Sequence, residues 1–352
     1  MSDFKKLDAV DFIKALAITC VVIYHFVTIY MQFIPDILRR LGFVLGTGCQ
    51  AFLVISGFGL YYSQRRRPLS APRFWLKRLS KVYFPYIIIV IISYYCQNVY
   101  LASGVDRFSA LMSHVFLYKM FFPQYEVTFG GHLWFISTII QFYLVFPLLV
   151  RIYKKLGTRR FLMLTFTVNV IWAAFTVIAG ISGERIWNSF FLQFLFEFAV
   201  GMAAAEHIDG VAAWFERTSA LKLLLLGAAG YALLLVCYFA GGIVGAFGDA
   251  PSAAGFIFCA LALYKLGIRP LNSFMVKLSS ISYEWYLVHY LVLLLCYFEV
   301  WAGISSLGED ILYAVGIFIL TLAAAAVYHF LWSNFTRLLK KGWTGLTKKM
   351  QK

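Results

Sequence analysis

Apolar stretches of about 20 residues recur along almost the whole chain of 352 residues. Each stretch is long enough to cross the hydrocarbon core of a bilayer as a helix. Because lipid leaves no water to satisfy an open strand edge, helices are the expected spanning structure. The pattern predicts an all-α integral membrane protein of about ten transmembrane helices, at about 9–30, 41–62, 83–103, 132–151, 161–181, 190–207, 221–241, 251–267, 279–300 and 310–333.

Basic residues are distributed unevenly among the segments that would link these helices. If the N-terminus is cytoplasmic, 26 of the 31 Lys and Arg residues lie on the cytoplasmic side. Positive residues are retained on that side, so we expect both termini there, in the plasma membrane of what we expect to be a bacterial cell. The net charge of +15 then reflects topology and contact with membrane lipid, and it does not indicate nucleic-acid binding. We expect one membrane domain over 1–340 and a basic cytoplasmic tail at 341–352.

Lys14 and His25 lie within the first apolar segment, ten residues apart. Eleven steps of about 100° bring the two side chains almost into line, about three helical turns from one another. Taken singly, Lys14 could be an anchor at the membrane face and His25 a packing histidine. Ionisable groups at such depth are costly and usually functional, so the pair on one stripe favours a functional site.

A basic segment links the second and third apolar segments. Three arginines at 65–67 are followed by Arg73, Lys77, Arg78 and Lys81, which is more positive charge than orientation requires. Such side chains suit a polyphosphate, for example the nucleotide end of coenzyme A. An anchor for anionic lipid is the alternative.

Polar residues also recur at helical spacing in three other apolar segments. They are Ser56 in a stretch of small residues, His132 with Trp134, Ser137 and Gln141, and Ser282 with Tyr286 and His289. They favour a polar path through the membrane, although an interfacial aromatic belt around Trp134 and a structural hydrogen-bonded chain at 282–289 are alternatives. The six cysteines have no metal-like spacing, so we expect free thiols and no metal site.

In order and spacing, these stretches resemble the membrane acyltransferase-3 family, which includes O-acetyltransferases of polysaccharide, lipopolysaccharide and peptidoglycan. The resemblance covers about 1–150 and 190–333, and it rests on Lys14 to His25, 56–58, 78–85, 194–202 and 282–289. Lys14 and Lys81 stand where the family usually has Arg, which keeps the charge but loses the bidentate geometry. Ile139 stands where many relatives carry Glu, so a mechanism that uses this Glu is not expected here.

The resemblance implies an O-acetyltransferase that moves an acyl group, expected to be acetyl, from cytoplasmic acyl-coenzyme A to a hydroxyl of an extracytoplasmic polysaccharide or glycolipid. Acyl-coenzyme A is then a co-substrate, and no permanently bound cofactor is expected. Lys14, Arg73, Lys77, Arg78 and Lys81 would hold the donor phosphates. His25 would be the general base or a transient acyl carrier, with His289 and His132 as further catalytic residues. Ser56, Trp134, Ser137, Gln141, Ser282 and Tyr286 would line the substrate path.

Two other functions are compatible with the same residues. An exporter of a polysaccharide or of a lipid-linked sugar would use the intramembrane histidines and glutamates as a proton relay. A non-catalytic partner of a polysaccharide synthase would need these side chains only for assembly. Consumption of acyl-coenzyme A separates the first function from the other two.

Overall fold

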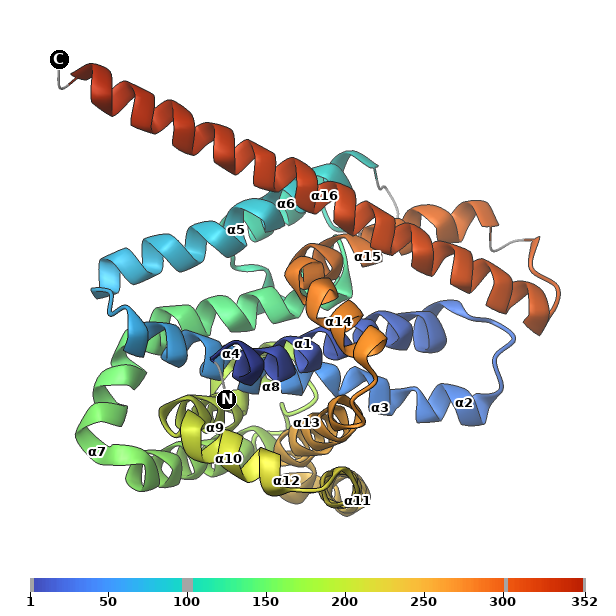
Figure 1. Ribbon diagram of the computed structural model, residues 1–352. Helices are drawn as coiled ribbons and strands as arrows, with labels where there is room; N and C mark the ends of the chain where they lie inside the picture. Colours follow the sequence, from blue (N-terminus) through green and yellow to red (C-terminus); the bar gives the residue numbers. More distant parts are fainter. Residues whose placement is uncertain (1–2, 97–103, 301–302, 351–352) are drawn as a thin grey trace.

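The computed structural model describes residues 3–96, 104–300 and 303–350, with side chains at 7–96, 104–296 and 303–338. All regular secondary structure in these ranges is helical, which confirms the expected fold class (Figure 1). The helices are α1 Asp3–His25, η1 Phe26–Tyr30, α2 Asp36–Leu41, α3 Phe43–Gly46, α4 Gly48–Arg66, α5 Ala71–Cys96, α6 Arg107–Val115, η2 Lys119–Phe121, η3 Pro123–Tyr125, η4 Gly131–Leu133, α7 Trp134–Ile178, α8 Arg185–Asn188, η5 Phe191–Phe194, α9 Leu195–Glu206, α10 Ile208–Arg217, α11 Ala220–Ala240, α12 Gly242–Gly245, α13 Asp249–Lys265, α14 Arg269–Leu278, η6 Ser279–Ile281, α15 Ser282–Val300 and α16 Leu307–Met350.

Eight helical stretches in the described ranges are long and apolar enough to cross a membrane. A ninth is the pair Phe191–Glu206 and Ile208–Arg217, which is bent by 88°. The number is lower than ten because the expected segments 132–151 and 161–181 share one stretch, Gly131–Ile178. The end of the expected segment 83–103, at 97–103, and the last two residues of the expected tail lie outside the described residues.

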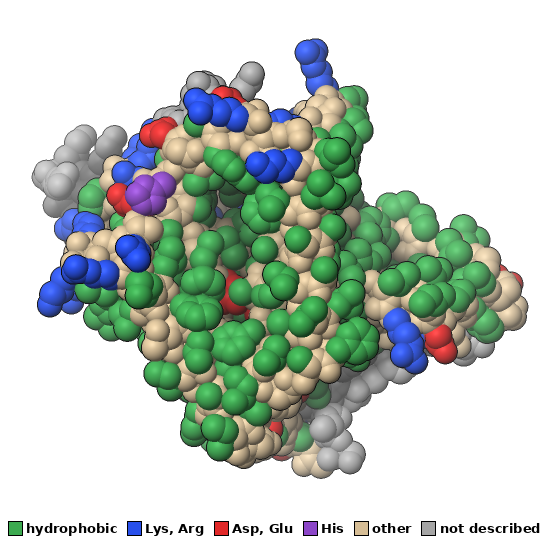
Figure 2. Space-filling model, turned by 90° about the horizontal axis from the view of Figure 1, so that it is seen from below, with side chains coloured by type: hydrophobic (Ala, Val, Ile, Leu, Met, Phe, Trp, Pro, Cys, Tyr) green, Lys and Arg blue, Asp and Glu red, His purple; other side chains and the backbone are tan. Residues whose placement is uncertain are grey.

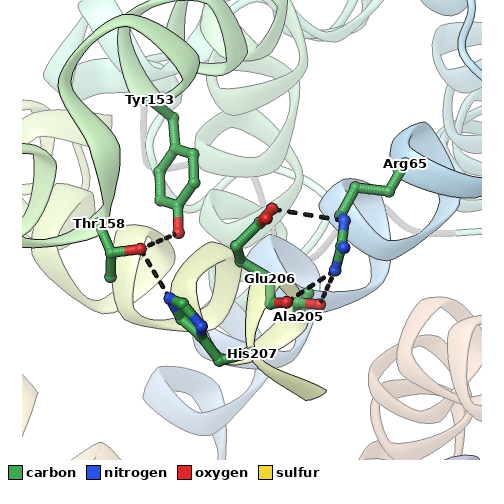
Figure 3. Close-up of polar contacts among 6 residues, drawn as sticks. All are labelled: Arg65, Tyr153, Thr158, Ala205, Glu206 and His207. Atoms are coloured by element: carbon green, nitrogen blue, oxygen red, sulfur yellow. Dashed lines mark hydrogen bonds and ion pairs between the residues drawn. The ribbon is translucent and has the colours of Figure 1, made fainter. Parts of the chain in front are cut away.

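Gly157 divides α7 into two legs, and the turn between them is visible in Figure 1. Its backbone has φ 73° and ψ 170°, a conformation that glycine adopts without steric cost. Beside this turn, Thr158 Oγ1 lies 2.7 Å from the Tyr153 hydroxyl and 2.8 Å from Nε2 of His207 (Figure 3). Side-chain hydrogen bonds therefore fasten the turn of α7 to the end of α9.

Consecutive long helices run in alternate directions, which gives the molecule two ends. We call the end that holds the α4–α5 connection and the turn of α7 the basic end, and the end that holds residues 104–131, 182–189 and 241–249 the loop end. Large hydrophobic side chains are exposed along the helices between the two ends, as expected for surfaces that face lipid. Figure 2 shows one such face, largely hydrophobic, with Lys and Arg gathered mainly toward its upper and left margins.

Glycines bring the backbones of α4 and α9 into contact. A Cβ atom added to Gly57 would lie 2.0 Å from the carbonyl oxygen of Phe198, and one added to Gly201 would lie 1.9 Å from the carbonyl oxygen of Val54. Small residues allow membrane helices to approach this closely. The contact fixes how the two helices are placed relative to one another.

Arg65 fastens the same two helices at the basic end (Figure 3). Its Nη1 donates to the carbonyl oxygens of Ala205 and Glu206 at 2.9 and 2.7 Å, and its Nε lies 3.4 Å from Oε2 of Glu206. The last carbonyls of a helix have no partner within the helix, so a cation there is stabilising. Arg65 therefore caps α9, and its guanidinium is committed to this contact.

Candidate active site

His25 and His289 form a hydrogen-bonded pair between α1 and α15. Nδ1 of His25 lies 3.1 Å from Nε2 of His289, and the two rings are stacked with their centroids 5.1 Å apart. Nδ1 of His289 lies 3.0 Å from the carbonyl oxygen of Trp285 and 2.8 Å from that of Tyr286. His289 is therefore held through both ring nitrogens, by His25 at Nε2 and by two backbone carbonyls of α15 at Nδ1.

These contacts assign the ring hydrogens of both histidines. A carbonyl oxygen only accepts, so Nδ1 of His289 carries the hydrogen and its Nε2 is an acceptor. His25 must then donate through Nδ1, which leaves the lone pair of His25 on Nε2. The two carbonyls belong to the backbone of α15, so this helix fixes the ring of His289. His289 in turn orients the imidazole of His25 through the hydrogen bond between them.

His132 completes a cluster of three histidines. Its ring stacks on Tyr290, with centroids 4.5 Å apart, and lies 5.0 Å from the ring of His289. Tyr286 donates its hydroxyl hydrogen to the backbone carbonyl of His132. Gly130, at φ 124°, admits the ring, because a Cβ there would lie 2.7 Å from it. The side chain of His132 is 5% exposed, and neither ring nitrogen has a hydrogen-bond partner among the described residues.

A cavity of about 730 Å³ reaches this cluster from the loop end. His25, His132, Tyr286 and Tyr290 line it, together with residues from the loop-end segments 126–127, 182–188 and 242–249. This volume is within the usual range for small-molecule sites, about 300–1,000 Å³. The cavity can therefore hold a ligand that approaches the histidines from the loop end.

The residues predicted to line a path are only partly brought together. Trp134 and Tyr286 line the cavity with His25 and His132, whereas His289 reaches it through its hydrogen bond to His25. The residues of the expected path that do not line it are Ser56, Ser137, Gln141 and Ser282. Gln141 instead holds the loop end in place, because its Oε1 accepts from the backbone N–H of Phe191 at 3.1 Å.

The predicted phosphate-binding cations lie at the basic end and away from the cavity. They are Lys14 on α1 and Arg73, Lys77, Arg78 and Lys81 on the first turns of α5. Lys14 and Lys81 share Glu284 of α15 as a charged neighbour. Oε1 of Glu284 lies 3.1 Å from Nδ1 of His329. Sequence reasoning missed His329, although Ser333 and Thr336 follow it at helical spacing, because its partner Glu284 lies 45 positions away on another helix.

Apolar side chains fill the stripe between Lys14 and His25. Ile18 and Val22 lie between them on the same face of α1; both are 0% exposed and belong to the main hydrophobic core. Eleven residues of helix separate the two ionisable groups by about 16 Å. The cations at the basic end and the histidines at the cavity are thus two separate groups in the described part of the chain.

A carboxylate and two amides form a second polar group in the lining of the cavity, which the sequence did not reveal. Asp249 of α13 accepts from Nε2 of Gln50 at 3.0 Å and from Nε2 of Gln193 at 2.8 Å. The three residues come from segments far apart in the chain, and no local spacing connects them. We call Asp249, Gln50 and Gln193 the carboxylate–amide group.

Buried titratable residues also lie beside the cavity in the 104–131 segment. Nδ1 of His114 lies 2.7 Å from the Tyr86 hydroxyl and Nε2 lies 2.9 Å from Oγ1 of Thr128, and burial lowers the pKa of His114 well below its usual value. Lys119 is 0% exposed, and its Nζ has no partner among the described residues. Burial lowers the pKa of Lys119 to about 7, although Glu126 opposes the shift. In the same described residues, no group of three His, Cys, Asp or Glu is placed to hold a metal ion, and all six cysteines are free.

Comparisons with known proteins show the family of the chain. The model of the acyltransferase domain of the acyltransferase-3 family matches residues 7–330. The chain is 25% identical over 267 residues to the acyltransferase MdmB of Streptomyces mycarofaciens, a match that covers 69% of this chain and 66% of that protein, just under two thirds of its length. No solved structure matches the chain. Since the family model spans nearly the whole sequence, the chain belongs to the acyltransferase-3 family, and its long apolar helices make it a multi-pass membrane protein.

Proposed function

We propose that this protein is an acetyltransferase, which moves an acetyl group from acetyl-coenzyme A to a hydroxyl of a glycan bound in the cavity. The observation that carries the proposal is the His25–His289 pair at the wall of a cavity open to the loop end. A hydrogen-bonded imidazole with a free lone pair beside a ligand cavity is suited to remove a proton from a hydroxyl. Acyltransferase activity as such rests on family membership.

In the proposed reaction, His25 is the general base. Its Nε2 takes the proton as the acceptor oxygen attacks the thioester carbonyl. Collapse of the tetrahedral intermediate breaks the carbon–sulfur bond, and the proton passes to the departing thiolate, so the products are an ester and free coenzyme A. His289 accepts the Nδ1 hydrogen of His25 throughout, which stabilises the imidazolium that forms and keeps its ring oriented.

His132 is proposed to stabilise the charge that develops on the carbonyl oxygen. Both of its ring nitrogens are buried without partners in the described residues, and its ring adjoins the pair. In either neutral tautomer one nitrogen carries a hydrogen, so the ring can donate to an oxyanion. Donors held in place before the reaction stabilise such charge without reorganising.

The donor is proposed to bind at the basic end through Lys14, Arg73, Lys77, Arg78 and Lys81. Their positive charge and their distance from the cavity fit a long donor whose phosphates and thioester lie far apart. The layer that contains Ile18 and Val22 is closed, so delivery of the thioester to His25 requires these side chains to move aside. We therefore propose that donor binding opens this layer.

The test measures turnover by the full chain in lipid nanodiscs, supplied with labelled acetyl-coenzyme A and with glycan from the envelope of the cells that produce the protein. Release of coenzyme A thiol and transfer of label are both measured. His25→Ala should lower turnover by about 10²- to 10⁴-fold, the usual contribution of a general base. His289→Ala should also lower kcat, and His289→Gln should restore part of it because the amide oxygen can accept from Nδ1 of His25.

His207→Gln is the matched control, because this histidine lies at the basic end and bonds to Thr158. It should leave turnover unchanged. Full activity of His25→Ala would exclude the assignment of the base. Wild-type protein that consumes no thioester would favour an exporter, or a partner of a synthase, over the proposed reaction.

A further inference from the structure

The carboxylate–amide group joins three elements at one place in the cavity lining. Gln50 comes from the first turn of α4, Gln193 from η5 and Asp249 from the start of α13, and all three line the cavity. Each oxygen of Asp249 accepts from a different glutamine. A carboxylate held from two sides by amides has a fixed orientation, which is what a recognition site needs.

A hydrogen-bond count shows what kind of ligand this group can take. A carboxylate offers about four acceptor positions, of which the two amides use two. Nε2 of Gln193 also donates to the carbonyl oxygen of Ala246 at 3.0 Å, and Oε1 of Gln50 is buried without a partner in the described residues. The group thus has acceptors to spare and few free donors. A complementary ligand must donate hydrogen bonds.

The charges around the cavity restrict the class of ligand that can bind there. Among the lining residues, Glu126 and Asp249 are acidic and Arg185 is the basic one. The guanidinium of Arg185 lies 5.4 Å from the ring centroid of Trp134, which holds it over the indole. An acidic ligand is therefore disfavoured beside the carboxylate–amide group.

We propose that Asp249, Gln50 and Gln193 bind two or more hydroxyl groups of the acceptor other than the hydroxyl that is acylated. The acceptor is then a neutral, polyhydroxylated sugar unit, and uronic acids and other anionic sugars are excluded. His132 lines the same cavity, its ring nitrogens have no hydrogen-bond partner among the described residues, and in the proposed reaction it marks where the reacting group lies. This inference rests on the proposed function, because it takes the ligand of the cavity to be the acceptor.

The test is binding of methyl glycosides to the protein in nanodiscs, with the glucoside, galactoside, mannoside, N-acetylglucosaminide and glucuronide as probes. At least one neutral glycoside should bind, and the glucuronide should bind weakest. Asp249→Asn should weaken neutral binding by about 10- to 100-fold, the usual loss when a hydrogen bond to a charged group is removed. Asp36→Asn, the same change at an exposed residue outside the cavity, should have no effect.

Monodeoxy glycosides identify the hydroxyls that are bound. Those that lose affinity for the wild type should bind Asp249→Asn no more weakly than the parent sugar does. If Asp249→Asn does not fold, Gln50→Met keeps the volume, removes one amide and should show the same loss. Unchanged affinity in the folded variant, equal binding of the glucuronide, or no binding of any neutral glycoside would each overturn the inference.

The binding measurement does not require turnover, so the two proposals can fail separately. Wild-type protein that binds neutral glycosides and never consumes thioester would refute the proposed reaction and leave the sugar site standing. If the wild type transfers acyl groups and Asp249→Asn has the same KM for acceptor as the wild type, the sugar site is refuted and the reaction stands. The KM for acyl-coenzyme A should be unchanged in this variant.

Discussion

Replacing Gly57 by alanine tests the backbone contact that joins α4 to α9. The added Cβ would meet the Phe198 carbonyl oxygen at 2.0 Å, whereas ordinary contact begins at 3.4 Å. The two helix backbones must therefore separate by about 1.4 Å, because neither atom belongs to a flexible side chain. Overpacking of this kind costs about 1–3 kcal/mol, and a rigid neighbour places Gly57→Ala near the upper value.

The expected result is a fall in melting temperature of about 4 °C, because an unfolding entropy of about 2.1 cal/mol/K per residue over 352 residues corresponds to about 1.4 °C per kcal/mol. The fall is measured on protein in nanodiscs by loss of helical signal on heating. Because Gln50 is on α4 and Gln193 leads into α9, separating the helices also displaces the amides of the cavity lining. Affinity for neutral glycosides should fall in parallel.

Gly59→Ala is the matched control, two residues further along the same helix. A Cβ at Gly59 meets nothing within 4 Å, so this variant should melt at or slightly above the wild-type temperature. Gly201→Ala strains the same contact from the other helix, and the double variant with Gly57→Ala should cost less than the two single changes added together. If Gly57→Ala and Gly59→Ala melt within about 1 °C of one another, the contact is not rigid and the reasoning fails.

Two further predictions concern the loop end. Gly130→Ala should lower kcat by at least about tenfold, because its Cβ would lie 2.7 Å from the His132 ring at a φ of 124°, whereas Gly131→Ala, whose Cβ has its nearest neighbours at 4.0 Å, should change the initial rate much less. Lys119 has a pKa of about 7 when folded against 10.5 for the free side chain, so the unfolded chain binds the extra proton between these values and stability rises with pH across that window. Relative to Lys119→Met, the wild type should therefore gain about 2–3 kcal/mol between pH 7 and pH 9, seen as a rising difference in melting temperature, and parallel curves would contradict the burial of its amine.

The membrane fold was predictable because each membrane-spanning helix can be recognised from its own stretch of sequence. A helix in lipid satisfies its own backbone, so twenty apolar residues suffice to identify it, and the expected all-α class is confirmed. Helix breaks were harder to predict. The glycine turn that joins two expected spans in α7, and the bend between α9 and α10, depend on contacts such as those of Thr158 with Tyr153 and His207.

The candidate site was predictable only where residues of one helix carry it. His25, His132 and His289 were identified singly as polar residues in apolar segments, and the orientation of both termini remains a prediction from charge. Their meeting, the tautomers that follow from it and the carboxylate–amide group involve contacts between residues up to 264 positions apart. Sequence periodicity reports which residues share one helix face, so it determined the spans and the buried histidines. Only tertiary packing decided which faces meet, since that depends on backbone approach at positions such as Gly57 and on hydrogen bonds between distant segments.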